Sequence, residues 1–125
     1  MDFTDYSMKA RDRGAMGFEV FQVTTLIADR SKIPEVMPDH LAYQAKLEAE
    51  GKLLLAGPIS DTEGGEIIGG SIILKAADMA EAVALAEADP MHASGARKFE
   101  LRRWLINEGG FNVRFGFSTG PARLV

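Results

Sequence analysis

The chain has 125 residues, a length that suits one domain with a single hydrophobic core, and its composition (46% hydrophobic, 26% charged) is close to the globular average. Its 14 basic and 18 acidic residues give a net charge of −4, so we expect no nucleic-acid partner. The absence of cysteine excludes disulfides, thiolate metal ligands and a cysteine nucleophile. No stretch is apolar enough for a signal peptide or a membrane span, so we expect a cytoplasmic protein with no membrane partner.

The first predicted element is a strand over residues 18–28, FEVFQVTTLIA, which is rich in β-branched and aromatic residues. Apolar side chains occupy both of its alternating faces, as in strands that are covered on both sides. Residues 1–17 precede it as an N-terminal extension for which we predict no element.

A helix follows, with Pro34 or Pro38 at its first position and Gly51 as its stop, because proline is tolerated at helix starts and glycine is common just after helix ends. At about 100° per residue, four side chains fall on one narrow side of this helix, which should face the core: Val36, His40, Tyr43 and Leu47. An imidazole therefore lies on an otherwise apolar stripe.

The next segments predict a hairpin and a second helix. Two strands, at residues 52–58 and 67–76, flank a turn with two glycines, and the glycines of GGEIIGG are assigned to the hairpin and to a close backbone approach. The helix covers DMAEAVALAEADP, where Asp78 and Glu81 form an acidic version of a capping box. Pro90 disfavours helical geometry at Asp89 and so ends the helix.

The last segments predict a strand at residues 98–107, one further strand at 111–117, where phenylalanine and valine alternate with polar or small residues, and a tail, STGPARLV. The domain is therefore predicted at residues 18–107, followed by a C-terminal extension at 108–125.

The predicted order of the domain is strand, helix, strand, strand, helix, strand, which is the βαββαβ unit of the ferredoxin-like α+β fold with an antiparallel sheet. Both helices should pack on one face of that sheet. Since the first strand is apolar on its other face too, we expect a homodimer joined through the sheet faces. The alternative is that one of the two terminal extensions covers this face within the same chain.

His40 and Asp89 are the candidate catalytic residues. If Pro38 begins its helix, His40 lies in the first turn, where the helix dipole favours a neutral imidazole. Asp89 is expected at the C-terminal end of the second helix, where a carboxylate costs about 0.3–1 kcal/mol. The topology brings these helix ends near each other, and a His–Asp pair makes a general base. The alternative is a structural role for both, with Asp89 capping the loop DPMHASG.

Other candidates are weaker. His92 and Ser94, in the loop after Pro90, are expected to line the same pocket, or to be exposed loop residues. His40, His92 and Asp89 together are a conceivable metal-ligand set, but no closely spaced histidine pair supports it. A further group of basic side chains could hold an anionic substrate or be solvated strand-edge charges: Arg97, Arg102 and Arg103.

The combination of several short motifs resembles the YCII-related (YciI-like) family. They are HLAY after a proline, GKLLLAGP before a glycine-containing acidic turn, AEADP ending the second helix, and LRRW in the last strand of the domain. The resemblance implies a ferredoxin-like fold of the dimeric α/β-barrel superfamily, dimerisation through the sheets, and a site built on a histidine and an aspartate. His40 and Asp89 match those two residues.

The resemblance also bears on the reaction. One branch of the family is associated with dehydrochlorination of a chlorinated hydroxyhydroquinone, and the fold is similar to that of muconolactone isomerase. We therefore expect a small enzyme without a cofactor or a metal, an isomerase or lyase that moves a proton on a small oxygenated ring compound. The alternative is a ligand-binding or regulatory dimer without turnover. The residues expected to line its pocket are Tyr43, Gly57, Pro58, His92 and Ser94.

Overall fold

The computed structural model describes all 125 residues, and they divide into two compact units. The larger unit is Glu19–Trp104, and the smaller one combines Met1–Phe18 with Leu105–Val125. Every residue predicted for the site belongs to the larger unit. None of the helices has the length and apolar character that crossing a membrane requires.

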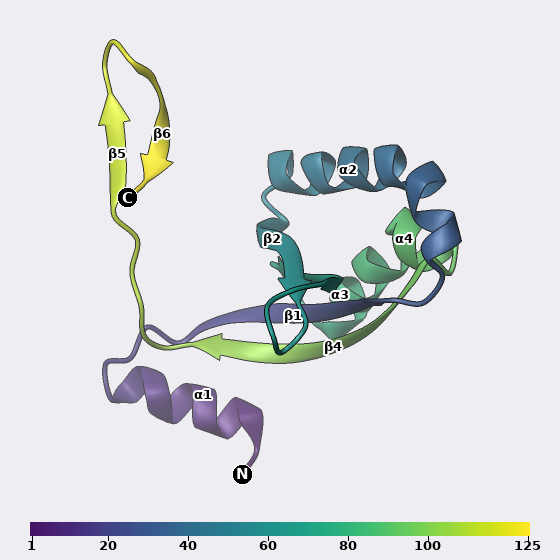
Figure 1. Cartoon of the computed structure of the whole chain (residues 1–125). Coiled ribbons are helices and arrows are strands. Elements are labelled where there is room, and N and C mark those ends of the chain that lie inside the picture. The colour runs from purple at the N-terminus through teal and green to yellow at the C-terminus, as the bar shows by residue number, and fades with distance from the viewer. The chain divides into compact units, whose positions relative to one another are not determined.

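The larger unit is built on a four-stranded sheet whose strand order is β2-β3-β1-β4. The strands are β1 (Phe18–Ile27), β2 (Leu53–Ser60), β3 (Ile67–Leu74) and β4 (Arg97–Ile106). β3 pairs antiparallel with both β1 and β2, and Figure 1 shows β1 and β4 running in opposite directions. With one helix after β1 and another after β3, this is the predicted ferredoxin-like α+β fold, which is confirmed.

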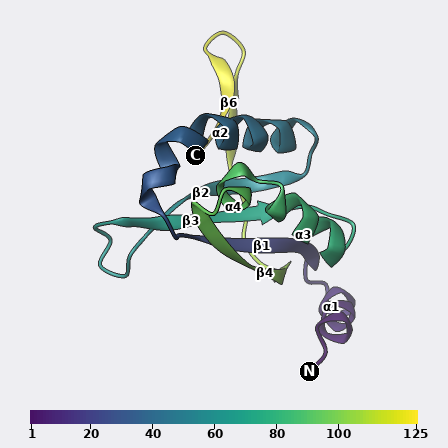
Figure 2. The same ribbon diagram turned by 90° about the vertical axis from the view of Figure 1, so that its right-hand side faces the viewer.

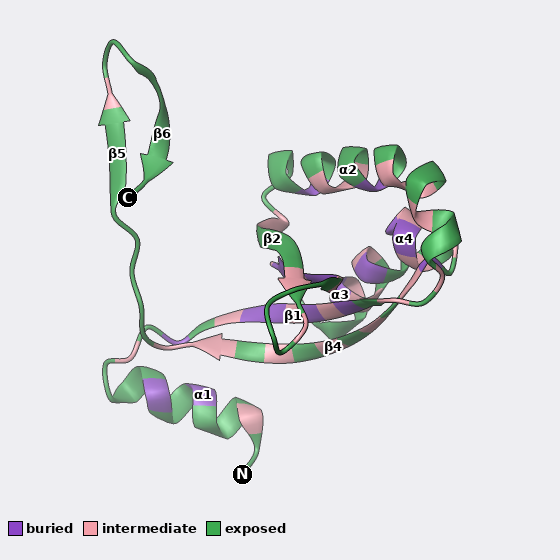
Figure 3. Ribbon diagram, in the orientation of Figure 1, coloured by how far each residue is buried: buried purple, intermediate pink, exposed green.

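The helices of this unit pack on one face of the sheet. They are α2 (Ile33–Ala49), α3 (Met79–Glu87) and the short α4 (Pro90–Ala93), and a 3-10 turn, η1 (Arg30–Lys32), precedes α2. Leu47 of α2 and two alanines of α3 join one core cluster with side chains of β1 and β3: Phe21, Val23, Ile72 and Leu74. α2 lies above β2 in both views, and its buried residues are on the side that faces the strands (Figures 1, 2 and 3).

α2 begins earlier than one of the two predicted starts. Its first residue is Ile33, so Pro34 lies at the tolerated start of the helix and Pro38 lies inside it. The alternative with Pro38 as the first helical residue is therefore wrong. His40 lies well inside the helix, too far from its positive end for the dipole to favour a neutral imidazole as predicted.

The capping residues of α3 and the glycines of β3 behave as predicted. The Asp78 side chain accepts a hydrogen bond from the Glu81 N–H at 2.8 Å and caps the helix. Gly69 faces Leu26 of β1, and a Cβ at Gly69 would collide with the backbone carbonyl of Thr25. Glycine at this position therefore lets β1 and β3 approach closely.

The smaller unit contains two elements that the sequence did not predict. Helix α1 (Phe3–Asp12) lies in the N-terminal extension, where Asp2 caps it by accepting from the Asp5 N–H at 3.0 Å. The predicted further strand is β5 (Val113–Gly116), and it pairs with β6 (Gly120–Leu124) in a segment predicted as a tail. Most of this hairpin is exposed (Figure 3), so it carries no buried pattern from which β6 could be predicted.

Candidate functional site

A cavity of about 510 Å³ lies between α2 and the sheet, in the size range of small-molecule pockets. Most of its wall is apolar and comes from α2 and the strands, including Ile27, Ile33, Met37, Leu41, Ile67 and Ile72. Five side chains of the wall carry polar groups: Thr25, Arg30, His40, Gln44 and Arg97. A few polar groups on apolar walls are the usual composition of a site that orients one small ligand.

His40 and Asp89 form a hydrogen-bonded pair at this cavity. The Nδ1 atom of His40 lies 2.8 Å from one carboxylate oxygen of Asp89 and 3.0 Å from the other, and both residues are buried. A carboxylate only accepts, so Nδ1–H donates, and the nitrogen left for a bound molecule is Nε2. His40 lines the cavity whereas Asp89 lies behind it, so the pair presents one free imidazole nitrogen to a ligand.

Asp89 also forms a hydrogen bond with a backbone group close to it in the sequence. α3 ends at Glu87, and Asp89 is the N-cap of α4, where its carboxylate accepts from the Met91 N–H at 2.9 Å. The expectation that Asp89 sits at the unfavourable end of a helix dipole is therefore wrong, because a new helix starts there. The predicted capping role and the predicted contact with His40 are made by the same carboxylate, which fixes its orientation.

The carboxyl group of Asp89 remains ionised because its hydrogen bonds outweigh its burial. Burial by itself raises the pKa of Asp89, but the hydrogen bonds from His40 and from the Met91 N–H bring this pKa below its ordinary value of 3.8. Asp89 can therefore stabilise a proton on His40 at neutral pH.

The second histidine has no free ring nitrogen. His92 Nδ1 donates to the Ala86 carbonyl at 2.6 Å, so its Nε2 is the acceptor for the Thr25 hydroxyl at 2.8 Å. Burial lowers the pKa of His92 and so favours the neutral ring that this arrangement needs. His92 was predicted to line the pocket, but the side chain that reaches the cavity from this pair is Thr25.

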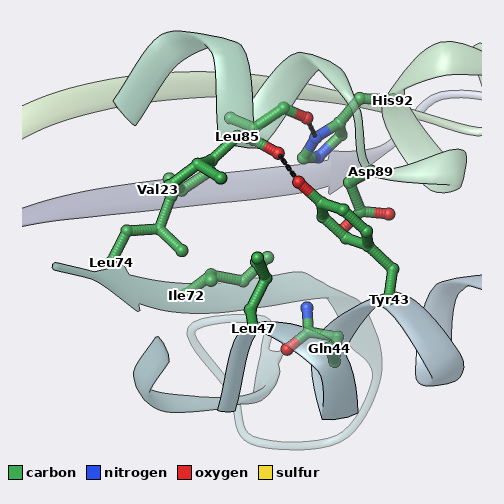
Figure 4. A pocket seen from close by; sticks show the side chains of 10 residues that line it. Val23, Tyr43, Gln44, Leu47, Ile72, Leu74, Leu85, Asp89 and His92 are labelled. Carbon is green, nitrogen blue, oxygen red and sulfur yellow. Dashed lines mark hydrogen bonds between the residues drawn. The ribbon is translucent and has the colours of Figure 1, made fainter. Parts of the chain in front are cut away.

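Tyr43 lies in the packed interior beside Asp89. Its hydroxyl donates to the Leu85 carbonyl at 2.7 Å, and Figure 4 shows the ring next to Asp89 and His92. These three side chains line a void of about 10 Å³. Such a void holds about one water molecule at most, so it is not a ligand site. Burial raises the pKa of Tyr43, and its hydroxyl stays protonated at neutral pH.

The structure thus separates the predicted pocket residues into two groups. Gly57 and Pro58 line the cavity with His40. Tyr43 and His92 line the separate small void. Ser94 lines neither the cavity nor the void, and its hydroxyl accepts from the Ala96 N–H at 3.2 Å. Three polar residues of the wall were not predicted from the sequence: Thr25, Arg30 and Gln44. Gln44 lies four residues after His40 on α2, so helical periodicity places both side chains on the same face and offered a signal for it.

Comparison with known families identifies the chain. A family model described as "YCII-related domain" matches residues 20–105. The chain belongs to this family. The resemblance drawn from HLAY, AEADP and the other motifs is therefore confirmed, and both His40 and Asp89 lie within the matched range.

This YCII-related domain has similar relatives among known proteins. "Uncharacterized protein YjpA" of Bacillus subtilis (strain 168) is 30% identical over 74 residues, which are 59% of this chain and 81% of that protein. Among solved structures, a similar chain is 5-chloro-2-hydroxyhydroquinone dehydrochlorinase (TftG) from Burkholderia phenoliruptrix AC1100, in complex with 2,5-dihydroxybenzoquinone. It matches with a TM-score of 0.58 and 23% identity over 68% of this chain and 92% of that chain, and so supports the fold.

The metal alternative has no ligand set in the YCII-related domain. No group of three or more histidine, aspartate or glutamate side chains converges to hold an ion. Both ring nitrogens of His92 and the Nδ1 atom of His40 are already engaged with protein partners.

Proposed function

We propose that this YCII-related domain is a small cofactor-independent enzyme, an isomerase or lyase, that transfers a proton on a small oxygenated ring compound. The observation that carries the proposal is the buried hydrogen bond of 2.8 Å between His40 and Asp89 beside a cavity of about 510 Å³. This pair combines a proton acceptor, a group that orients it, and room for a substrate.

In the proposed reaction, His40 is the general base and Asp89 its orienting partner. Asp89 holds the proton on Nδ1, so Nε2 accepts a proton from a carbon or oxygen of the substrate. The imidazolium that forms is stabilised by the ionised Asp89, and it returns the proton to another atom of the substrate or to the leaving group. The apolar walls strengthen these electrostatic interactions because they exclude water.

A ring substrate is supported by the shape of the site and by analogy. The solved structure of similar fold is a dehydrochlorinase of a hydroxyhydroquinone, bound to a dihydroxybenzoquinone. Apolar side chains cover most of the cavity of this chain, and its polar groups are few, which suits a flat ring with oxygen substituents.

The proposal is tested with 5-chloro-2-hydroxyhydroquinone and a panel of phenols and lactones. Chloride release and exchange of substrate hydrogen with deuterated water are measured for the native protein and for His40→Gln. We expect His40→Gln to lower the rate by about 10²–10⁴-fold, the usual contribution of a general base.

His92→Gln is the matched control, since it replaces the other histidine by the same residue and should change the rate less than about tenfold. Equal rates for native protein and His40→Gln would contradict the proposal. Binding of several panel compounds without turnover or exchange would favour the ligand-binding or regulatory role instead.

We also propose that two copies associate through the sheet face opposite the helices. Large apolar side chains on that face are exposed, at 45% for Leu26, 47% for Leu55 and 45% for Trp104. Light scattering tests this, and a mass near the chain's own 13.5 kDa would contradict it. A cytoplasmic location remains a prediction that cell fractionation tests.

A further inference from the structure

The cavity wall carries positive charge that forms no direct ion pair. Arg97 and Arg30 both line it, and no aspartate or glutamate does. Arg30 is an exposed residue whose Nη2 donates to the Ile67 carbonyl at 3.4 Å. Arg97 forms no ion pair, and its Nε is a buried donor without a hydrogen-bond partner.

The Nε–H group of Arg97 has almost no accessible surface, so a ligand in the cavity meets the guanidinium through its terminal N–H groups. A hydrogen bond from a charged donor to a ligand acceptor contributes more than one between neutral groups. Burial lowers the pKa of Arg97 and the negative charge of Asp89 partly offsets this, and arginine stays protonated in proteins. The guanidinium at this wall of the cavity is therefore a cation without a direct ion-pair partner, since the carboxylate of Asp89 is hydrogen-bonded to His40.

Thr25 also lines the cavity, but it is only 1% exposed and its hydroxyl proton is donated to Nε2 of the neutral His92. Thr25 therefore offers a ligand no donor, whereas Arg97 suits a ligand group that accepts. His40 Nε2 supplies the proton acceptor of the proposed reaction.

We propose that the substrate of this cavity is an organic anion with an apolar ring, and that Arg97 is the residue that binds its oxyanion. This inference rests on the proposed function and specifies its substrate class. The ring lies against the apolar wall, and its ionised oxygen accepts from the Arg97 guanidinium. Arg97 is a binding residue here, and the proton transfer belongs to His40.

The test compares an anionic probe with a neutral one of similar size. Calorimetry measures binding of 2,5-dihydroxybenzoquinone, which is ionised at neutral pH, and of hydroquinone, which is not. We expect Arg97→Gln to weaken binding of the anion by about tenfold or more, as for the loss of a hydrogen bond to a charged group, and to change hydroquinone binding much less.

Lys98→Gln is the control, because it removes the same charge from the next residue of β4, which is exposed. It should leave the affinity for both probes unchanged. The inference is overturned if the Arg97→Gln variant binds the anion as tightly as native protein does. It is also overturned if native protein binds the anion no better than hydroquinone at millimolar concentration.

A measurement on the native protein covers the case in which Arg97→Gln fails to fold. The ¹H–¹⁵N signal of Arg97 Nε should shift when the anion binds, while that of the exposed Arg102 stays in place. An unmoved Arg97 signal at saturation would overturn the inference.

The failures of the two proposals are distinguishable. If the anion binds through Arg97 but His40→Gln leaves the rate unchanged, the proposed function fails and the binding role of Arg97 stands.

Discussion

The two histidines of this chain lie in the same layer of the structure but have different hydrogen-bond partners. His40 donates from Nδ1 to the Asp89 carboxylate and keeps Nε2 free at the cavity. His92 donates from Nδ1 to the Ala86 carbonyl and uses Nε2 to accept from Thr25. Both are at least half-buried, so burial does not distinguish them.

The comparison shows that the partner of a histidine decides what the ring can do. A carboxylate stabilises a proton on the ring opposite it, whereas a carbonyl oxygen carries no full charge and does so much less. A free nitrogen at a cavity can accept a proton from a ligand, and a nitrogen occupied by a hydroxyl cannot. His40 has both requirements for a base, and His92 has neither.

Replacing Asp89 by asparagine is expected to have the largest effect on the difference between the two histidines. The amide oxygen can still accept from the Met91 N–H, but the charge that stabilises protonated His40 is lost. We expect the proton-transfer rate to fall by about 10²–10⁴-fold. Asp39→Asn, a change at an exposed position of α2, is the control, and similar rates for the two variants would argue against the dyad.

Replacing His92 by glutamine should lower stability rather than proton transfer. The change disrupts hydrogen bonds to the Ala86 carbonyl and the Thr25 hydroxyl, and we expect the free energy of unfolding to fall by about 1–3 kcal/mol. Urea denaturation followed by circular dichroism measures this. A loss of activity as large as that of His40→Gln, in folded protein, would show that the two histidines act together.

The pH dependence of stability should show the smallest effect. Because the folded state lowers the pKa of Asp89 below its ordinary 3.8, the unfolded chain binds the proton more readily. The stabilising contribution is fully present above that ordinary value and is lost as the pH falls through the folded pKa. Native protein should therefore lose its stability advantage over Asp89→Asn on acidification below about pH 4. A constant difference down to pH 2 would contradict the lowered pKa.

Much of the fold could be predicted from the sequence because its signals are local. A run of β-branched and aromatic residues marked β1, the Asp78 and Glu81 pair marked the start of α3, and the order of elements limited the topology to the ferredoxin-like arrangement. The misses have local causes as well. Pro38 is tolerated inside α2, and the exposed β6 has no buried face to show in its pattern.

The sequence by itself determined the order of strands and helices and the two residues of the proposed dyad, because periodicity and family motifs are written along the chain. Only the tertiary structure decided that Asp89 caps α4 while it holds Nδ1 of His40, since this geometry joins residues 49 positions apart. It also decided that Arg97, and not Ser94 or His92, lines the cavity. Side-chain convergence depends on how strands and helices pack in three dimensions, and no local pattern encodes that.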